Sequence, residues 1–200
     1  MSKALIDPSI NFRGKFYSIQ NTRLNPRSIQ KPSPPLWIVA NNERSLKLAQ
    51  FNDFGVLIRG VFKHPDCEGR SRDLEAFINK FKPSDRKCIQ AIIYVADTKK
   101  DAADATNLAR KAIAHTLNLR SKCKEINNED REHDAIDLEV KTHAIIGTIE
   151  EVIEKISSCH REVKFSHLIA NFCFADMEED KVFKSMEKFA KFVMPVIKSL

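Results

Sequence analysis

The sequence contains no uninterrupted apolar run of the roughly 18 residues that a membrane-spanning helix needs. Its first residues, MSKALIDPSINFRG, also lack the long apolar stretch of a secretory signal. We therefore expect a protein that works in the cytoplasm and has no membrane partner.

Metal and disulfide signatures are missing as well. The five cysteines are an odd number and no two form a CxxC pair, and the six histidines show no HExxH pattern. These spacings argue against zinc sites and disulfide frameworks. We expect no metal, and we interpret Cys88 and Cys173 as small apolar residues of strands.

No dense basic block is present, although the formal net charge is +6. The 33 Lys and Arg residues are interleaved with 27 acidic residues, which is typical of a solvated charged surface. Nucleic acid is therefore not expected as a partner. With 42% hydrophobic residues, the 200-residue chain is expected to form one globular domain, residues 1–200.

What the sequence does contain is an alternation of short apolar runs with helical patterns. Residues 12–20 predict an extended segment or hairpin, and residues 24–35, with four prolines, predict a loop. Beyond them we expect strands at 36–40, 54–62, 88–96 and 165–174, separated by helices at 43–52, 72–81, 98–119, 148–156 and 179–194. This order predicts an α/β fold with a parallel sheet.

Several helix ends carry recognisable signals. Thr98 with Asp101 and Thr148 with Glu151 have the spacing of capping boxes, and Pro195 predicts the end of the last helix at Met194. Residues 120–144 are polar and of mixed charge, so we expect a loop with some helix. The segments are then 1–35 as a lead-in, 36–119 as three βα units, 120–144 as a loop and 145–200 as helix, strand and helix.

Four stretches together resemble luciferase-like flavin-dependent monooxygenases. They are FRGKFYSIQNTRLNP (12–26), PPLWIVANNERSLKLAQFNDFGVLIRG (34–60), IIGTIEEVIEKI (145–156) and SMEKFAKFVMPVIK (185–198). The third is similar to the GTPEEV helix start of the family, with Ile149 in place of proline. The resemblance covers nearly the whole chain in the family's order.

The resemblance implies the second half, strands 5–8, of a TIM (β/α)8 barrel. The chain then looks truncated, with a complementing N-terminal half or self-association needed to cover its edges. The implied activity is oxidation of an organic substrate with O2 and reduced FMN from a separate reductase, or with a deazaflavin instead. A non-catalytic flavin-binding or interaction module remains the alternative.

Candidate site residues lie after the first two strands. By resemblance, Asn41, Asn42 and Ser45 face the flavin phosphate, where a helix start attracts anions. The same residues also suit a plain helix cap. Arg59, at the end of the second strand, is expected to meet a phosphate or an acidic substrate, or else an ordinary ion pair. No catalytic residue is assigned.

Three weaker candidates remain open. His167 in the last strand is either an acid or base of the site or a core histidine. Gly147 with Thr148 either donates to an anion or only starts a helix. The polar segment 120–144 falls where family members carry a lid that excludes water, or it is an ordinary loop.

Overall fold

The structure, a computed structural model, describes residues 2–40, 42–59, 86–121 and 129–200. Contacts along the chain divide it into two units, Met1–Trp37 and Ile38–Leu200. The predicted helix at 72–81 lies outside the described residues, as do Asn41 and the end of the second predicted strand. Within the described ranges, no helix combines the length and apolar character needed to cross a membrane.

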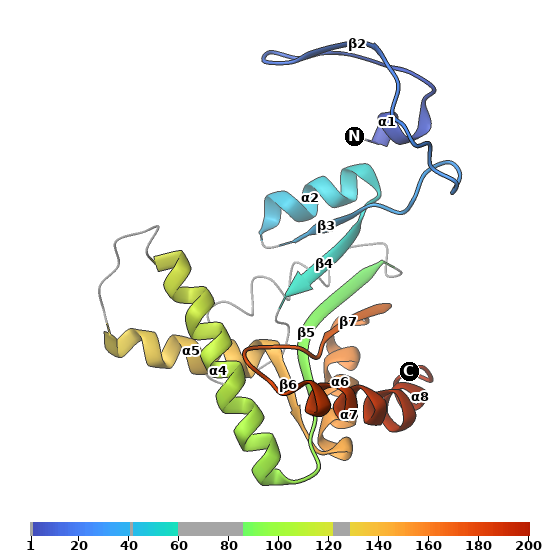
Figure 1. Cartoon of the computed structure of the whole chain (residues 1–200). Helices are drawn as coiled ribbons and strands as arrows, with labels where there is room; N and C mark the ends of the chain where they lie inside the picture. The colour runs from blue at the N-terminus through green and yellow to red at the C-terminus, as the bar shows by residue number, and fades with distance from the viewer. Residues whose placement is uncertain (1, 41, 60–85, 122–128) are drawn as a thin grey trace. The chain divides into compact units, whose positions relative to one another are not determined.

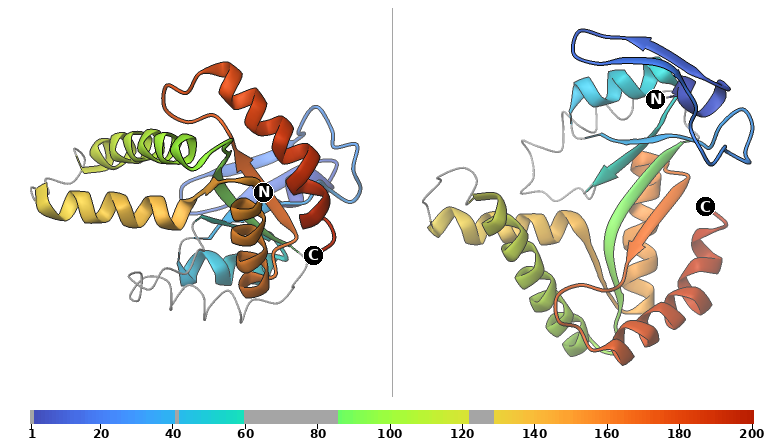
Figure 2. Two further views of the ribbon diagram at one scale, coloured as in Figure 1. Left: turned by 90° about the horizontal axis from the view of Figure 1, so that it is seen from below. Right: turned by 45° about the horizontal axis from the view of Figure 1, so that its top comes forward.

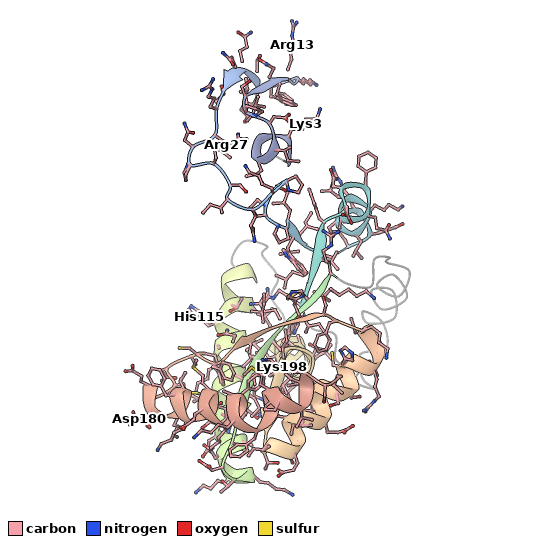
Figure 3. The ribbon with its side chains drawn as sticks, turned by 90° about the vertical axis from the view of Figure 1, so that its right-hand side faces the viewer. Lys3, Arg13, Arg27, His115, Asp180 and Lys198 are labelled. Carbon is pink, nitrogen blue, oxygen red and sulfur yellow. The ribbon has the colours of Figure 1, made fainter. Side chains whose placement is uncertain are left out.

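The first unit is built on a hairpin. Strands β1 (Ile10–Arg13) and β2 (Ser18–Thr22) pair antiparallel, which confirms the hairpin expected near residues 12–20. A short helix, α1 (Ser2–Ile6), precedes them and was not predicted. Arg27 donates from its guanidinium to the carbonyls of Ile6, the last residue of this helix, and of Asp7. Figure 3 labels Arg27 in this unit together with Lys3 and Arg13. The proline-rich segment forms no regular element, as predicted.

The second unit contains a sheet built around a long central strand, β5 (Lys87–Val95; Figure 1). Its other strands are β3 (Trp37–Val39), β4 (Gly55–Arg59), β6 (Ala144–Gly147) and β7 (His167–Asn171). Each of β4, β6 and β7 pairs parallel with β5, and β3 is hydrogen-bonded to β4. The predicted parallel α/β sheet is therefore confirmed.

Two residues of β5 determine which strand lies on which edge. Ile89 is paired with Ile58 of β4 and with Leu168 of β7, so these strands occupy opposite edges. Ile92 is likewise paired with both β6 and β7, through Ala144 and Asn171. Strands β4 and β6 thus follow one another along one edge, and β7 takes the other. Strand β6 was not predicted, because its four residues look like a lead-in to the next helix.

The two faces of β5 pack against different helices. Ala91, Ile93 and Val95 pack under α6 (Ile149–Val163) and the last helix, and Ile89 contacts α2 (Glu43–Asn52) in a neighbouring cluster. On the other face, Tyr94 packs against alanines of α4 (Lys99–Ser121). Helices cover the first face of β5 along these residues. On the second face, α4 covers β5 only toward the end of the strand.

Both predicted capping boxes mark real helix starts. The Glu151 amide donates to Thr148 Oγ1 at 3.5 Å, and its carboxylate accepts from the Thr148 amide at 2.9 Å. The Asp101 amide donates to Thr98 Oγ1 at 3.1 Å. The Asp101 carboxylate instead accepts from the Asp97 amide and from the Tyr94 hydroxyl. Burial and the Asp101 charge raise the pKa of Tyr94, which therefore stays protonated and tethers β5 to α4.

The segment 120–144 was expected to be a loop with some helix, but its described part is mainly helical. Residues Glu129–His143 form helix α5, which packs against α4 (Figure 2). Arg110 Nε lies 2.7 Å from Asp137 Oδ1 across this helix pair. The segment is rich in charge and poor in apolar periodicity, so its helical state depends on packing against α4 rather than on an apolar stripe of its own.

The last helix also continues past its predicted end. It consists of α7 (Glu179–Lys188), a π-helical turn η2 (Phe189–Val193) and α8 (Met194–Ile197). The Met194 amide donates to the carbonyl of Phe189, five residues back. Pro195 lacks an amide hydrogen and its ring crowds the preceding turn. The wider π turn makes room for it, so the helix is not terminated.

Helical periodicity predicts that Phe183, Met186, Phe189 and Val193 lie on the buried side of this helix, and this is confirmed only for Phe189 and Val193. Phe183 and Met186 are 58% and 43% exposed, whereas Ser185 is buried. Ser185 Oγ accepts a hydrogen bond from the Val95 amide at 2.9 Å. Strand β7 pairs with β5 only as far as Ile92, so this amide has no strand partner on that edge. A helix hydroxyl replaces the missing strand, a role that hydrophobic periodicity cannot indicate.

We expect Ser185→Ala to lower the free energy of unfolding by about 1–3 kcal/mol, because it leaves the buried Val95 amide without an acceptor. Ser199→Ala, at an exposed hydroxyl near the chain end, is the matched control and should change stability by less than about 0.5 kcal/mol. Urea denaturation followed by circular dichroism measures both. Equal stabilities for the two variants would contradict the role given to Ser185.

Candidate functional site

The first predicted site residues form the start of α2. The Ser45 amide donates to Asn42 Oδ1 at 3.0 Å, and the Asn42 amide donates to Ser45 Oγ at 3.3 Å. The Ser45 hydroxyl in turn donates to the Asn42 carbonyl at 2.8 Å. The cap interpretation of these residues is therefore borne out in the geometry. Asn41 lies outside the described residues.

A phosphate is still compatible with this helix start. The cap uses Asn42 Oδ1, which leaves the Asn42 Nδ2 amide as a donor on an exposed side chain. The first amides of a helix have no partner within the helix, and the helix dipole favours an anion there. The Ser45 hydroxyl has already donated its proton to the Asn42 carbonyl, so it serves an anion less well than Asn42 does.

Arg59 lies elsewhere, at the last position of β4. It is paired in register with Gln90 of β5, and residues paired in this way project to the same face of the sheet. Among the described residues, no hydrogen bond or ion pair joins Arg59 to Asn42 or Ser45. The Ala40 amide donates to the Leu57 carbonyl at 2.9 Å, so α2 begins near the end of the sheet at which Arg59 lies.

Arg59 lines a hollow of about 250 Å³ between the open face of the sheet and the helix pair α4–α5. The sheet contributes Gln90, Ile92 and Asn171, and the chain beyond β7 contributes Cys173 and Phe174. The helices contribute Ile113, Thr116, Leu117, Glu139 and His143. Among the described residues, the hollow therefore combines the Arg59 cation, two amides, the Glu139 carboxylate with His143, and an apolar side. An apolar surface with a few polar groups is the usual composition of a small-molecule site.

On the α5 side of the hollow, a histidine and a carboxylate lie in contact. His143 Nδ1 lies 3.0 Å from Glu139 Oε2, one helical turn away. The same nitrogen also lies 2.9 Å from Thr142 Oγ1. This part of the segment, interpreted from sequence as either a lid or an ordinary loop, is a helix that contributes Glu139 and His143 to the hollow.

The weaker candidates do not reach this hollow. His167 begins β7 in register with Cys88, near the opposite end of the strand, and its Nδ1 lies 2.8 Å from Ser166 Oγ. At Gly147–Thr148, the carboxylates of Glu150 and Glu151 already accept from Thr148, at 2.9 Å each. Hydrogen bonds from the backbone and from Thr148 lower the pKa of Glu150, so this helix start is occupied by negative charge and suits an anion poorly.

The described cysteines show different environments. Burial raises the pKa of Cys88, and raises that of Cys159 to about 12, so neither thiol is reactive at neutral pH. Cys173, expected as an apolar strand residue, instead follows β7, is exposed and faces the hollow. No cluster of three or more His, Cys, Asp or Glu side chains suited to a metal is found in the part of the chain that the structure describes.

Sequence reasoning found Arg59 but missed Gln90, Asn171, Cys173 and His143. The first two lie in runs that look uniformly apolar in the sequence, IQAIIYV and IANFCF. A polar residue at every second position of a strand can indicate a ligand-lining face, but only once the strand bounds are known. His143 could not be found, because the helix that carries it was not expected.

Comparison with known proteins identifies relatives over most of the chain. The family model described as luciferase-like monooxygenase matches residues 1–164. The oxygenase component of the flavin-dependent trigonelline monooxygenase of Acinetobacter baylyi is 28% identical over 97 residues, which cover 47% of this chain and 27% of that protein.

Two solved structures are similar in fold at 17% identity. The monooxygenase RslO1 from Streptomyces bottropensis has a TM-score of 0.67, with 97% of this chain and 57% of that chain covered. The coenzyme F420-dependent tetrahydromethanopterin reductase from Methanopyrus kandleri has a TM-score of 0.66, with 97% and 60% covered. The chain thus spans about a quarter of the curated relative and under two thirds of these two structures. On the family match over residues 1–164, this chain belongs to the luciferase-like monooxygenase family.

Proposed function

We propose that this chain is part of a flavin-dependent monooxygenase that oxidises an organic substrate with O2 and reduced FMN. The observation that carries the proposal is the family match over residues 1–164. A bound reduced flavin would supply the electrons and the oxygen chemistry, while the protein binds, orients and shields the reactants from water. A cytoplasmic location goes with this proposal, because a reductase must supply the reduced flavin.

In this proposal the start of α2 holds the flavin phosphate. Asn41 and Asn42 would donate from their side chains, and Ser45 would position Asn42 through the capping box. Arg59 is the cation at the same end of the sheet, and either the phosphate or an acidic substrate could use it. A deazaflavin is the second cofactor candidate, since one solved structure of similar fold is F420-dependent.

We further propose that the sheet corresponds to strands 5–8 of a TIM barrel and is completed by other strands. Among the described strands, β7 pairs only with β5 and β3 only with β4, so each has one outer edge without a strand partner. Exposed edges of this kind associate readily with further strands. A complementing N-terminal half or self-association would cover them. If neither occurs, a non-catalytic flavin-binding or interaction module is the alternative function.

The phosphate site predicts that FMN binds more tightly than riboflavin, which has no phosphate. We expect the difference to be about tenfold or more, as for a charge-assisted hydrogen-bond site. The combined Asn42→Ala and Ser45→Ala variant should bind FMN and riboflavin equally weakly. Quenching of flavin fluorescence measures both affinities, and thermal unfolding measures the stability of each variant.

Thr148→Ala is the matched control for this experiment, because it removes the cap of α6 without touching α2. Both variants should lose about 1 kcal/mol of stability. Only the α2 variant should lose the preference for FMN. If both variants lose stability but still prefer FMN to riboflavin, Asn42 and Ser45 are simply a helix cap.

A second prediction separates the enzyme from the binding module. In an oxygenase, the chain should change the rate at which reduced FMN is reoxidised by O2, because the bound flavin is shielded from water and bulk oxygen. Stopped-flow mixing of reduced FMN and excess protein with aerated buffer, followed by visible flavin absorbance, measures this rate. Binding without a rate change would favour the non-catalytic module, and absence of binding would remove both flavin functions.

A further inference from the structure

We infer that the hollow between the sheet and the α4–α5 helix pair binds a small organic anion through Arg59, Gln90 and Asn171, and that this anion is the substrate. The inference extends the proposed function and depends on it only for identifying the anion as the substrate. The binding of the anion itself rests only on the geometry of the hollow.

The charge of the hollow comes from Arg59. Its side chain is exposed, and it makes no ion pair with any residue that the structure describes. A guanidinium presents several donors in one plane, which matches the two oxygens of a carboxylate or the face of a sulfonate. A cation that lines a partly enclosed hollow and has no partner among the described residues is suited to a negatively charged ligand.

Two amide side chains supply further donors on the same face of the sheet. Gln90 is paired directly with Arg59, and Asn171 is paired with Ile92, two residues further along β5. Adjacent strands lie about 4.8 Å apart, so the backbones of Arg59 and Asn171 are on the order of 12 Å apart across β5. Neither amide side chain bonds to another described residue. Both can therefore turn toward a ligand that lies across β5.

The remaining lining residues and the volume of the hollow determine which ligand body fits. Ile92 from the sheet and Ile113 and Leu117 from α4 form an apolar side. At about 250 Å³ the hollow is slightly below the roughly 300–1,000 Å³ of sites for drug-sized ligands. A small molecule with an apolar body and one anionic end fits this composition better than an extended cofactor does.

Among the described lining residues, the acidic side chain lies on the α5 side. Glu139 Oε2 is 3.0 Å from His143 Nδ1, and both residues line the hollow. The Arg59 charge at the end of β4 attracts the anionic end of the ligand, so that end is expected to lie at β4. This end of the sheet would then hold two separate anions, the flavin phosphate at α2 and the substrate at Arg59.

Benzoate and benzamide test this inference, because they differ in charge but hardly in shape. We expect the chain to bind benzoate at least tenfold more tightly than benzamide, and Arg59→Gln to abolish that preference. Arg13→Gln, at an exposed arginine of the first unit, is the matched control and should keep it. NMR titration measures both affinities. Alkylation of Cys173, resolved by peptide mass spectrometry, should slow when benzoate is bound and remain unchanged with benzamide.

Equal affinity of the wild-type chain for the two probes, or a preference that survives in Arg59→Gln, would overturn the inference. If FMN displaces benzoate and Arg59→Gln reduces the preference for FMN over riboflavin, Arg59 holds the flavin phosphate and the inference is wrong, while the proposed function stands. If benzoate binds as expected but no flavin does, the anion site is supported and the proposed function fails.

Discussion

The pairing of β5 on both of its edges is the constraint on which the candidate site depends. Arg59 reaches the hollow because β4 is held in register on one edge, and Asn171 reaches it because β7 is held on the other. Beyond the end of β7, the Ser185 hydroxyl accepts a hydrogen bond from the Val95 amide of β5. The Tyr94–Asp101 hydrogen bonds tie the end of β5 to α4. A shift of either neighbour by one residue would turn its polar side chain to the helix-covered face.

The two faces of β5 explain why polar residues are tolerated in a buried strand. Ile89, Ala91 and Ile93 lie under helices, where an unpaired polar group would cost several kcal/mol. Gln90 lies on the face that helices leave partly open, where solvent or a ligand can satisfy its amide. The same alternation that stabilises the core therefore concentrates donors on the other face. The hollow forms where that face meets α4 and α5.

Sequence was informative wherever a local signal determined the structure. The capping residues of α2, α4 and α6 were recognised because a side chain must satisfy the first amides of a helix. The parallel sheet followed from apolar runs that separate helical segments. Helix α5 and strand β6 could not be found, because α5 is polar and packs on α4, and β6 is a short strand that depends on pairing with β5. The continuation of the last helix required a π turn ahead of Pro195, which no residue pattern indicated.

The site was predictable only in part for the same reason. Arg59 ends a recognisable strand and can be placed at the sheet end from sequence, whereas Gln90 and Asn171 become neighbours of the hollow only through the register of three strands. Asn42 and Ser45 illustrate the opposite case, since their cap explains them without any ligand. A capped helix start is nevertheless a better anion site than an uncapped one, because the cap holds the first turn in the helical geometry that directs its remaining amides outward. Stability and binding at α2 therefore depend on the same hydrogen bonds, and only the presence or absence of a phosphate on the flavin separates them.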